Sequence, residues 1–472
     1  MASNRRDFLK HSLIGAGILG SGLTSLVVLP EAASAKTKKK VVGAQQFNMC
    51  GFVAPKLDVV RIGIIGLGNR GPGAVDRLSY IQGVEIKALG DLYEDRVEKA
   101  QNILTKKGLP KAVGYSGSRD AWKQMCERDD IDLIYTCTPW AMHTPIAVYA
   151  MEHGKHAATE VPAAITLEEC WQLVETSEKT RKHCMMLENC CYDFFELMTL
   201  NMVRQGYFGE VIHGEGAYIH NLLSSNFEKE GYAEMWRLKE NFKNGNLYPT
   251  HGLGPICQIM NINRGDQMDY LVAMQSNDFM MAETAKRLAA QDGFYNEFAG
   301  KTYRGNMNNT VIRTFKGKTI LVQHDVTSPR PYSRLHIVAG TKAYAQKYPT
   351  PARVAVEDAW LNPEEMKKLE DQYSPEIVRK VGEMAKEIGG HGGMDFMMDW
   401  RLIDCLRNGL PLDQDVYDAA LWSSISPLSQ QSIANRSASV DIPDFTRGAW
   451  KNNQPVELTL KGGGTTGVNK KK

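Results

Sequence analysis

Three glycines near residue 70 have the spacing of a turn that binds phosphate groups. Gly66, Gly68 and Gly71 form a G-x-G-x-x-G pattern directly after the apolar run 59–65. In such a turn the first glycine permits a tight bend, the second lets the backbone approach a pyrophosphate, and the third lets a helix pack against the strand. The N-terminus of that helix offers free N–H groups and a partial positive charge to the phosphates. We therefore expect a dinucleotide site here rather than an ordinary surface turn.

The carboxylate of Asp91 indicates which dinucleotide is bound. It follows the apolar strand 84–90 and lies 20 residues after Gly71, where such folds place the acid that binds a ribose 2′-hydroxyl. A carboxylate at this point would repel the 2′-phosphate of NADP. The expected cofactor is therefore NAD; the alternative is that Asp91 is only a surface residue after an unrelated turn.

A second strand end carries side chains that can reach the other half of the dinucleotide. The buried run 131–137 stops at Thr138-Pro139, and Trp140 and His143 follow at once. Ligands of open α/β sheets lie beyond the carboxyl ends of the strands, so these two residues are expected to contact the nicotinamide. A lone histidine is as often structural, and for His143 both interpretations remain open.

The elements that must hold these residues alternate between strands and helices up to about residue 189. This order predicts a parallel, doubly wound sheet, that is, an α/β Rossmann nucleotide-binding domain. After residue 190 half-exposed strands, one hairpin and late helices predict an α+β domain with an open, mostly antiparallel sheet. The expected strands are 59–65, 84–90, 131–137, 156–159, 184–187, 210–220, 309–315, 319–326 and 335–339, and the expected helices are 94–107, 118–128, 146–154, 167–179, 395–407 and 416–429.

Length and composition fit a globular chain of two domains. The 472 residues are 43% hydrophobic and 23% charged, with a formal net charge of +2, so nothing indicates nucleic acid as a partner. The nine cysteines show no C-x-x-C pair and no metal-ligand spacing, so we expect free thiols and no metal site. The expected divisions are a signal peptide at 1–35, a linker at 36–56, the NAD-binding domain at 57–189, the second domain at 190–455 and a flexible tail at 456–472.

The first 35 residues have the features of an export signal. Arg5 and Arg6 precede a glycine-rich apolar stretch at 12–29, and Ala33-Ser34-Ala35 supplies a small-x-small cleavage site. The segment resembles a twin-arginine signal, which implies a periplasmic protein that is exported already folded. The cleavage site argues against the rival interpretation, a stable membrane anchor. The cofactor would then be loaded in the cytoplasm and retained.

The glycine turn, Thr138-Pro139 with His143, and Glu160-x-Pro162 together resemble the glucose–fructose oxidoreductase / inositol dehydrogenase family. In the dehydrogenases of that family the middle position of the last triplet is usually lysine, which assists hydride transfer. This chain has Val161 there, and a valine side chain can neither donate nor accept a proton. The substitution disfavours simple alcohol oxidation.

A wider set of motifs resembles one branch of that family, glycoside hydrolase family 109, whose members are NAD-dependent α-N-acetylgalactosaminidases. The set spans both expected domains and includes the valine. Its members are Asn4-Arg5-Arg6, Gly66-Leu-Gly-Asn69-Arg70-Gly71, Thr138-Pro-Trp140 with His143, Glu160-Val161-Pro162, Glu188-Asn189-Cys-Cys-Tyr192 and Tyr248-Pro249-Thr250-His251-Gly252.

The resemblance assigns roles to individual residues. His251 and Tyr248 are the implied proton shuttle, since histidine titrates near neutral pH and an activated phenol can also transfer a proton; a structural turn is the alternative. Glu160 is implied to bind the nicotinamide ribose, although a catalytic carboxylate is the other option, and the guanidinium of Arg70 is implied at a phosphate or ribose. The implied cofactor-binding set is Gly66, Gly68, Asn69, Arg70, Gly71, Asp91, Trp140, His143, Glu160, Val161 and Asn189, and the implied substrate-binding set is Tyr218, Arg237, Tyr248, His251 and Tyr332.

The implied reaction is hydrolysis of a terminal α-linked N-acetylgalactosamine. The sugar is oxidised at C3, deprotonated at C2 and eliminated at C1; water then adds and C3 is reduced again, with NAD regenerated in each turnover. Two other functions stay open from the sequence: a sugar or cyclitol dehydrogenase of the same superfamily, and a non-catalytic sugar-binding protein that retains NAD. A homo-oligomer is also left open.

Overall fold

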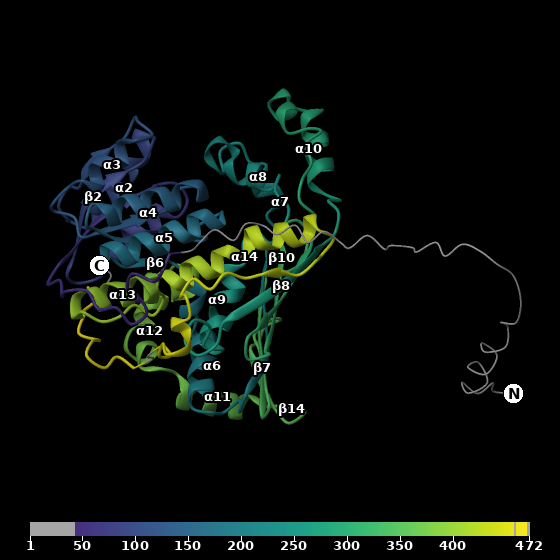
Figure 1. The fold of residues 1–472 in the computed structure, drawn as a ribbon. Helices are drawn as coiled ribbons and strands as arrows, with labels where there is room; N and C mark the ends of the chain where they lie inside the picture. The colour runs from purple at the N-terminus through teal and green to yellow at the C-terminus, as the bar shows by residue number, and fades with distance from the viewer. Residues whose placement is uncertain (1–42, 457–458, 470–472) are drawn as a thin grey trace, which may run out of the picture. The chain divides into compact units, whose positions relative to one another are not determined.

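The computed structural model describes residues 43–456 and 459–469 (Figure 1). The chain from Gln45 onward forms one compact unit. The predicted export signal at 1–35 lies outside the described residues, so it stays a prediction. Within the described part, no helix combines the length and the apolar character needed to cross a membrane.

The first sheet is the predicted Rossmann sheet, with six parallel strands in the order β3-β2-β1-β4-β5-β6. The central strand β1 (Val60–Ile65) is an almost unbroken apolar run because helices cover both faces of such a sheet. The strand order reverses between β1 and β4, and a crevice opens at the carboxyl ends there. The other strands are β2 (Val84–Gly90), β3 (Val113–Tyr115), β4 (Leu133–Thr136), β5 (His156–Thr159) and β6 (Cys184–Met186).

The helices between these strands begin where the sequence supplies starting signals. The first helix, α1, begins at Gly71, the third glycine of the turn, with a proline in its first two positions. Thr166 and Glu169 form a capping box at the start of α5. The bounds are α1 (Gly71–Leu78), α2 (Glu94–Lys106), α3 (Ala121–Cys126), α4 (His143–Glu152) and α5 (Leu167–Thr180).

The second sheet has nine strands in the order β14-β13-β12-β11-β7-β10-β9-β8-β15. Strands β7 and β10 are parallel and the other described pairs are antiparallel, which confirms the expected architecture. The predicted hairpin is also confirmed, as β9 and β10. The bounds are β7 (Val211–Ile219), β8 (Met268–Gln275), β9 (Asn308–Thr314), β10 (Thr319–Asp325), β11 (Ser333–Gly340), β12 (Ala343–Gln346), β13 (Arg353–Val356), β14 (Ala359–Trp360) and β15 (Val440–Asp441).

Two buried helices pack between the sheets, and the second of them contacts strands of both. Helix α9 (Thr250–Ile259) packs on β7, and α14 (Val416–Ala434) packs on β8 of the second sheet as well as on α5 and β6 of the first (Figure 1). The site residues of both halves are therefore held by one continuous core. The remaining helices are α6 (Phe194–Arg204), α7 (Leu223–Asn226), α8 (Trp236–Glu240), α10 (Met281–Ala289), α11 (Pro363–Tyr373), α12 (Glu376–Ile388) and α13 (Met394–Asn408), with short 3-10 turns at η2 (Trp140–Met142), η3 (Asn189–Tyr192), η4 (Ala233–Met235), η5 (Gly293–Glu297), η6 (His391–Gly393) and η7 (Ala449–Lys451).

Two late parts of the chain lie against the first sheet. Helix α13, which falls within the predicted second domain at 190–455, packs on α1 and β1, and its Asp399 accepts hydrogen bonds from Tyr135 and Arg77 at 2.8 Å each. The tail expected to be flexible is fixed over 459–469, where Val468 pairs with Ile81 and Gly467 accepts a backbone hydrogen bond. The low-complexity composition gave no sign of these contacts, because backbone groups make most of them.

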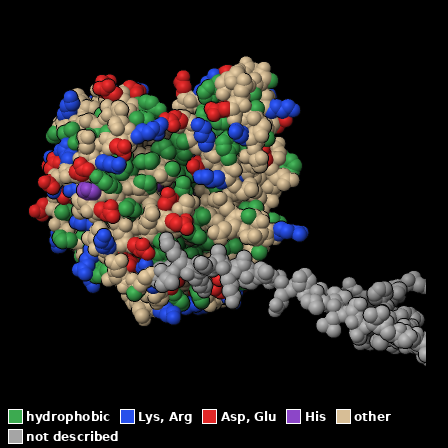
Figure 2. All heavy atoms as spheres, turned by 45° about the horizontal axis from the view of Figure 1, so that its top comes forward, with side chains coloured by type: hydrophobic (Ala, Val, Ile, Leu, Met, Phe, Trp, Pro, Cys, Tyr) green, Lys and Arg blue, Asp and Glu red, His purple; other side chains and the backbone are tan. Residues whose placement is uncertain are grey.

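The described end of the predicted linker at 36–56 packs against the rest of the compact unit. The side chain of Gln45 donates a hydrogen bond to the Tyr417 hydroxyl at 2.8 Å, and Met49 is buried. All nine cysteines are free thiols, as predicted. On the face shown in Figure 2, acidic and basic side chains are interspersed, as the small net charge leads one to expect.

Candidate active site

A cavity of about 490 Å³ lies beyond the carboxyl ends of the parallel strands. Its far wall is formed by the segment 231–237 and by Tyr248, which belong to the second half of the chain. Most of the predicted cofactor residues line it, together with two of the predicted substrate residues. These are Gly66, Gly68, Asn69, Arg70, Asp91, Trp140, His143, Glu160 and Val161, with Arg237 and Tyr248.

The three glycines of the turn differ in the space around them, and the differences match the roles predicted for a pyrophosphate-binding turn. Gly66 has φ +91°, and a Cβ there would lie 2.6 Å from the backbone carbon of Cys137. A Cβ at Gly71 would lie 2.1 Å from the carbonyl oxygen of Gly66. At Gly68 the nearest atom would be a guanidinium nitrogen of Arg96 at 3.5 Å, so this backbone is open to a ligand. The turn therefore fits a dinucleotide.

Asp91 is held at the edge of the same turn. One carboxylate oxygen accepts the backbone N–H of Leu67 at 2.7 Å, and the other accepts that of Tyr93 at 3.0 Å. The guanidinium of Arg96 lies 3.7 Å from the second oxygen and lines the cavity. The sequence analysis did not include Arg96 in the site. Its position in the first turn of α2, five residues after Asp91, could have indicated that it lies near the nucleotide.

His143 is fixed by two backbone carbonyl groups. The residue is buried, with its Nδ1 2.7 Å from the oxygen of Pro162 and its Nε2 2.8 Å from that of Thr138. Burial lowers the pKa of His143, while the two carbonyl groups and Glu160 oppose that shift. The ring therefore ties two strand-end loops together at the cavity wall, and this geometry favours the structural interpretation of His143.

The predicted nicotinamide-side residues belong to one ionic network. Arg70 donates to Glu160 at 2.7 Å and to Asp395 at 3.0 Å, and Asn189 also donates to Asp395. The Arg70 guanidinium is thus used in ion pairs in this structure, whereas the resemblance implied a phosphate or ribose contact. Neither Asn189 nor Asp395 lines the cavity, and both are linked to it through Arg70.

Asp395 is a residue that the sequence analysis missed. Burial raises the pKa of its carboxyl, but the hydrogen bond from His391 and the charges of Arg70 and Arg77 hold that pKa well below its usual value. The segment 389–393 that leads into Asp395 contains four glycines with positive φ, and His391 between them has φ +48°. This glycine-rich run was the available signal, since such backbone clusters near functional sites.

An aromatic cluster meets the cavity at Trp140 and Tyr248, which both line it. The ring centroids of Trp140 and Tyr248 are 5.6 Å apart, those of Tyr248 and Tyr218 are 4.5 Å apart, and those of Tyr248 and His251 are 4.9 Å apart. The Arg237 guanidinium lies 5.4 Å from the Tyr248 ring. The fold therefore brings the predicted shuttle residues and two predicted substrate residues together beside the nucleotide cavity.

Tyr248 is set up to stay protonated. Burial raises the pKa of its phenol well above the usual value, and nearby Tyr218 and Glu160 add to this effect against the charge of Arg237. A phenol in this state donates hydrogen bonds or a proton and does not act as a base.

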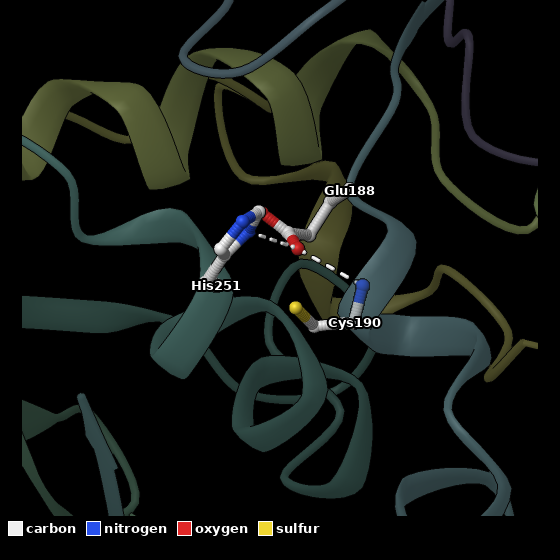
Figure 3. Close-up of side chains that lie close together, drawn as sticks. All are labelled: Glu188, Cys190 and His251. Carbon is white, nitrogen blue, oxygen red and sulfur yellow. Dashed lines mark hydrogen bonds and ion pairs between the residues drawn. The ribbon is translucent and has the colours of Figure 1, made fainter. Parts of the chain in front are cut away.

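His251 contacts the buried carboxylate of Glu188, a residue of the family motif to which the sequence assigned no role. The Nδ1 atom of His251 lies 2.7 Å and 3.0 Å from the two carboxylate oxygens of Glu188, whose side chain is 0% exposed (Figure 3). One of these oxygens also accepts the backbone N–H of Cys190 at 3.1 Å. Burial raises the pKa of Glu188, but its contacts with His251 outweigh this and lower the pKa overall.

Glu188, Cys190 and His251 also have the ligand types of a metal site, since one ligand atom from each lies within 4.8 Å of the others. Sequence spacing gave no sign of this grouping. Two features favour a hydrogen-bonded pair instead: the imidazole nitrogen and the carboxylate contact each other directly, and burial raises the pKa of the Cys190 thiol well above its usual value. Cysteine binds a metal as the thiolate, and the protonated Cys190 is not in that form. The direct contact between His251 and Glu188 suits proton transfer instead.

Tyr332 lies at the outer edge of the cluster, with its ring 5.0 Å from His220 and 6.4 Å from Tyr218. It directly precedes β11, whose register shifts twice near its start, with Leu335 and His336 at positive φ. Such bulges redirect side chains next to active sites. His220 was missed by the sequence analysis; its Nδ1 lies 3.0 Å from the Tyr218 hydroxyl.

Comparison with known proteins agrees with this geometry. Residues 192–452 match the family described as "Glycosyl hydrolase 109, C-terminal domain", and residues 60–188 match "Oxidoreductase family, NAD-binding Rossmann fold". A Bacteroides fragilis (strain YCH46) protein named Glycosyl hydrolase family 109 protein 1 is 52% identical over 444 residues, which cover 90% of this chain and 94% of that protein.

The chain belongs to glycosyl hydrolase family 109. A second relative from Bacteroides fragilis (strain ATCC 25285), named Alpha-N-acetylgalactosaminidase, is 54% identical over 413 residues, or 86% of this chain and 96% of that protein. The chain is thus a glycoside hydrolase with an NAD-binding Rossmann domain, as the sequence motifs predicted.

Solved structures of low identity share the fold of this family 109 member. Levoglucosan dehydrogenase in complex with NADH superposes with a TM-score of 0.59 at 16% identity, covering 82% of this chain and 99% of that one. An oxidoreductase domain protein from Kribbella flavida gives a TM-score of 0.62 at 15% identity, covering 82% and 100%. These matches support the two-sheet architecture.

Proposed function

We propose that this chain is an NAD-dependent α-N-acetylgalactosaminidase that removes terminal α-linked N-acetylgalactosamine. One observation carries the proposal: Tyr248 lines the nucleotide cavity and contacts His251, the other predicted proton-transfer residue, while the position of the dehydrogenase lysine holds Val161. The relative named Alpha-N-acetylgalactosaminidase, at 54% identity, supports this choice of sugar.

The residues would divide the work as follows. When bound, NAD⁺ would supply hydride transfer: C3 would lose a hydride to the cofactor and its hydroxyl proton to solvent, and both would be restored within the same turnover, so that no net redox change results. A C3 ketone makes the C2 hydrogen acidic, and His251 would remove it through Nε2; the contact between its Nδ1 and Glu188 supports this role. Tyr248 would donate a hydrogen bond to the C3 oxygen, and Arg237 would hold hydroxyl or acetamido oxygens.

The test uses the purified enzyme and a nitrophenyl α-N-acetylgalactosaminide, with no NAD added. Release of nitrophenol without accumulation of NADH supports the proposal. Steady NADH formation from a free sugar would instead identify a dehydrogenase. Binding of both NAD and sugar with no turnover of either substrate would identify a sugar-binding protein.

We further propose that the chain is exported folded by the twin-arginine route and acts in the periplasm. The support is the sequence at 1–35, with paired Arg5 and Arg6. Replacing both arginines by lysine should leave the protein in the cytoplasmic fraction of a bacterial host, and unchanged export of that variant would refute the route. We also propose that the protein forms a homo-oligomer, and the molar mass of the mature protein measured by light scattering tests this.

A further inference from the structure

We propose that Glu188 is a positioning residue that makes His251 the base at C2. It would do so by accepting the Nδ1–H of His251, which fixes the tautomer whose free lone pair is on Nε2. This inference rests on the proposed function and assigns the proton acceptor within it.

The geometry defines the direction of this hydrogen bond. Both carboxylate oxygens of Glu188 face Nδ1 of His251, at 2.7 Å and 3.0 Å. An ionised carboxylate accepts hydrogen bonds and cannot donate one, and the contacts of Glu188 lower its pKa despite complete burial. The proton of a neutral His251 must therefore reside on Nδ1, and Nε2 is left as an acceptor.

Glu188 is fixed by its surroundings as well as by His251. Its carboxylate accepts the backbone N–H of Cys190 at 3.1 Å, and its backbone oxygen accepts the side-chain amide of Gln414 at 3.0 Å. Gly254 of α9 leaves room for it, since a Cβ there would lie 3.0 Å from the Glu188 Cγ. Burying an ionised carboxylate is costly unless it is paired, and here the partner is the predicted base.

The other titratable groups around the imidazole of His251 are uncharged at neutral pH. Burial raises the pKa values of Cys190, Tyr218 and Tyr248, so these groups keep their protons. Burial, and then the charges of Arg237, His251 and His391, lower the pKa of His220. Among these described groups, Glu188 is the one that brings a negative charge to the ring, and it can stabilise the imidazolium formed when a proton is taken up.

In the proposed step one proton moves from the sugar to His251 and one bond of the sugar breaks. Nε2 of His251 takes the proton from C2 of the 3-keto sugar. The electron pair of the broken C–H bond forms the C1–C2 double bond, and the C1–O bond breaks with its electron pair leaving on the glycosidic oxygen. Glu188 stays ionised throughout and pairs with the imidazolium, whose proton exchanges with solvent before water adds at C1 and C2 is protonated again.

The test compares Glu188→Gln with a matched control, Glu178→Gln. Glu178 is a buried carboxylate as well, but it pairs with Tyr417 and Arg447 rather than with the site. We expect Glu188→Gln to lower kcat by about 100-fold or more, the usual contribution of general acid–base catalysis, with KM within about threefold. As the pH is lowered, kcat/KM of Glu188→Gln should also begin to fall at a lower pH than that of the parent enzyme, because the variant has no carboxylate to favour the imidazolium. Glu188→Asp should recover part of kcat.

Two measurements separate folding and function from positioning. Bound NAD per chain and the unfolding temperature report on folding. In the ¹⁵N-histidine NMR spectrum of the unmutated chain, the resonance lost in His251→Ala should show Nδ1 protonated at alkaline pH. Protonation at Nε2, or a folded Glu188→Gln variant with the kcat and pH profile of Glu178→Gln, would overturn the inference. A parent that releases no nitrophenol refutes the proposed function instead, and the tautomer measurement still decides the inference.

Discussion

The substitution Gly68→Ala separates nucleotide binding from folding more cleanly than an alanine at Gly66 or Gly71. An added Cβ would find its nearest neighbour at 3.5 Å, the guanidinium of Arg96, which is an ordinary contact with a flexible side chain. Gly68 is not among the glycines with positive φ, so alanine fits its backbone. The stability of the nucleotide-free protein should therefore change by less than about 1 kcal/mol, because the unfolded chain also loses freedom on substitution by alanine.

Binding should respond far more strongly than folding. The added methyl group occupies the side of the turn that a pyrophosphate approaches. Inserting a methyl group into a close contact costs about 1–3 kcal/mol, and each 1.4 kcal/mol is a factor of ten in affinity. The dissociation constant of NAD should rise by about 5- to 150-fold, and purified protein should carry much less nucleotide.

The assay is nucleotide content by chromatography of the denatured protein, together with the unfolding temperature with and without added NAD. Gly71→Ala is the matched control: its Cβ would lie 2.1 Å from the backbone oxygen of Gly66, so it should destabilise the turn itself. Full retention of nucleotide by Gly68→Ala would refute the assigned role of this turn. So would equal loss of stability in both variants.

Three further predictions follow from the network and the cluster. His251→Ala and Tyr248→Phe should each lower kcat by about 10² to 10⁴ with bound NAD unchanged, and loss of NAD in the same variants would contradict separate roles. Asp395→Asn removes a buried partner of Arg70 and Arg77, so it should destabilise the protein by about 3 kcal/mol in denaturant titrations; a change below about 0.5 kcal/mol would contradict this. The pKa of Glu196 is depressed because Lys347 and Arg334 outweigh its burial, so its stabilisation is present above the unfolded pKa of about 4.3 and is lost as pH falls below it. Melting at decreasing pH should therefore show a smaller decline in Glu196→Gln than in the parent.

The sequence was most informative where contacts are local. The glycine turn, Asp91 and the strand ends at Thr138 and Glu160 depend on neighbours within one βαβ unit, so spacing alone predicted the nucleotide cavity. The hairpin β9–β10 was predicted for the same reason, because two alternating strands flank a short turn.

Contacts between segments far apart in the chain could not be predicted from the sequence. Glu188 and His251 lie 63 residues apart, and only the packing of α9 beside the end of β6 brings them together. Asp395 reaches Arg70 because α13 returns to the first sheet, and the fixed segment 459–469 follows it there. No periodicity or composition encodes such a return, since backbone hydrogen bonds and single buried side chains determine it.

The most direct test of the central claim is the fate of a deuterium label at C2 of the sugar. An α-N-acetylgalactosaminide deuterated at C2 is hydrolysed in ordinary water by enzyme that carries only its own nucleotide. The account predicts that the released sugar has lost deuterium, because the C2 proton passes through His251 and exchanges with solvent. Full retention of deuterium during nitrophenol release would contradict it.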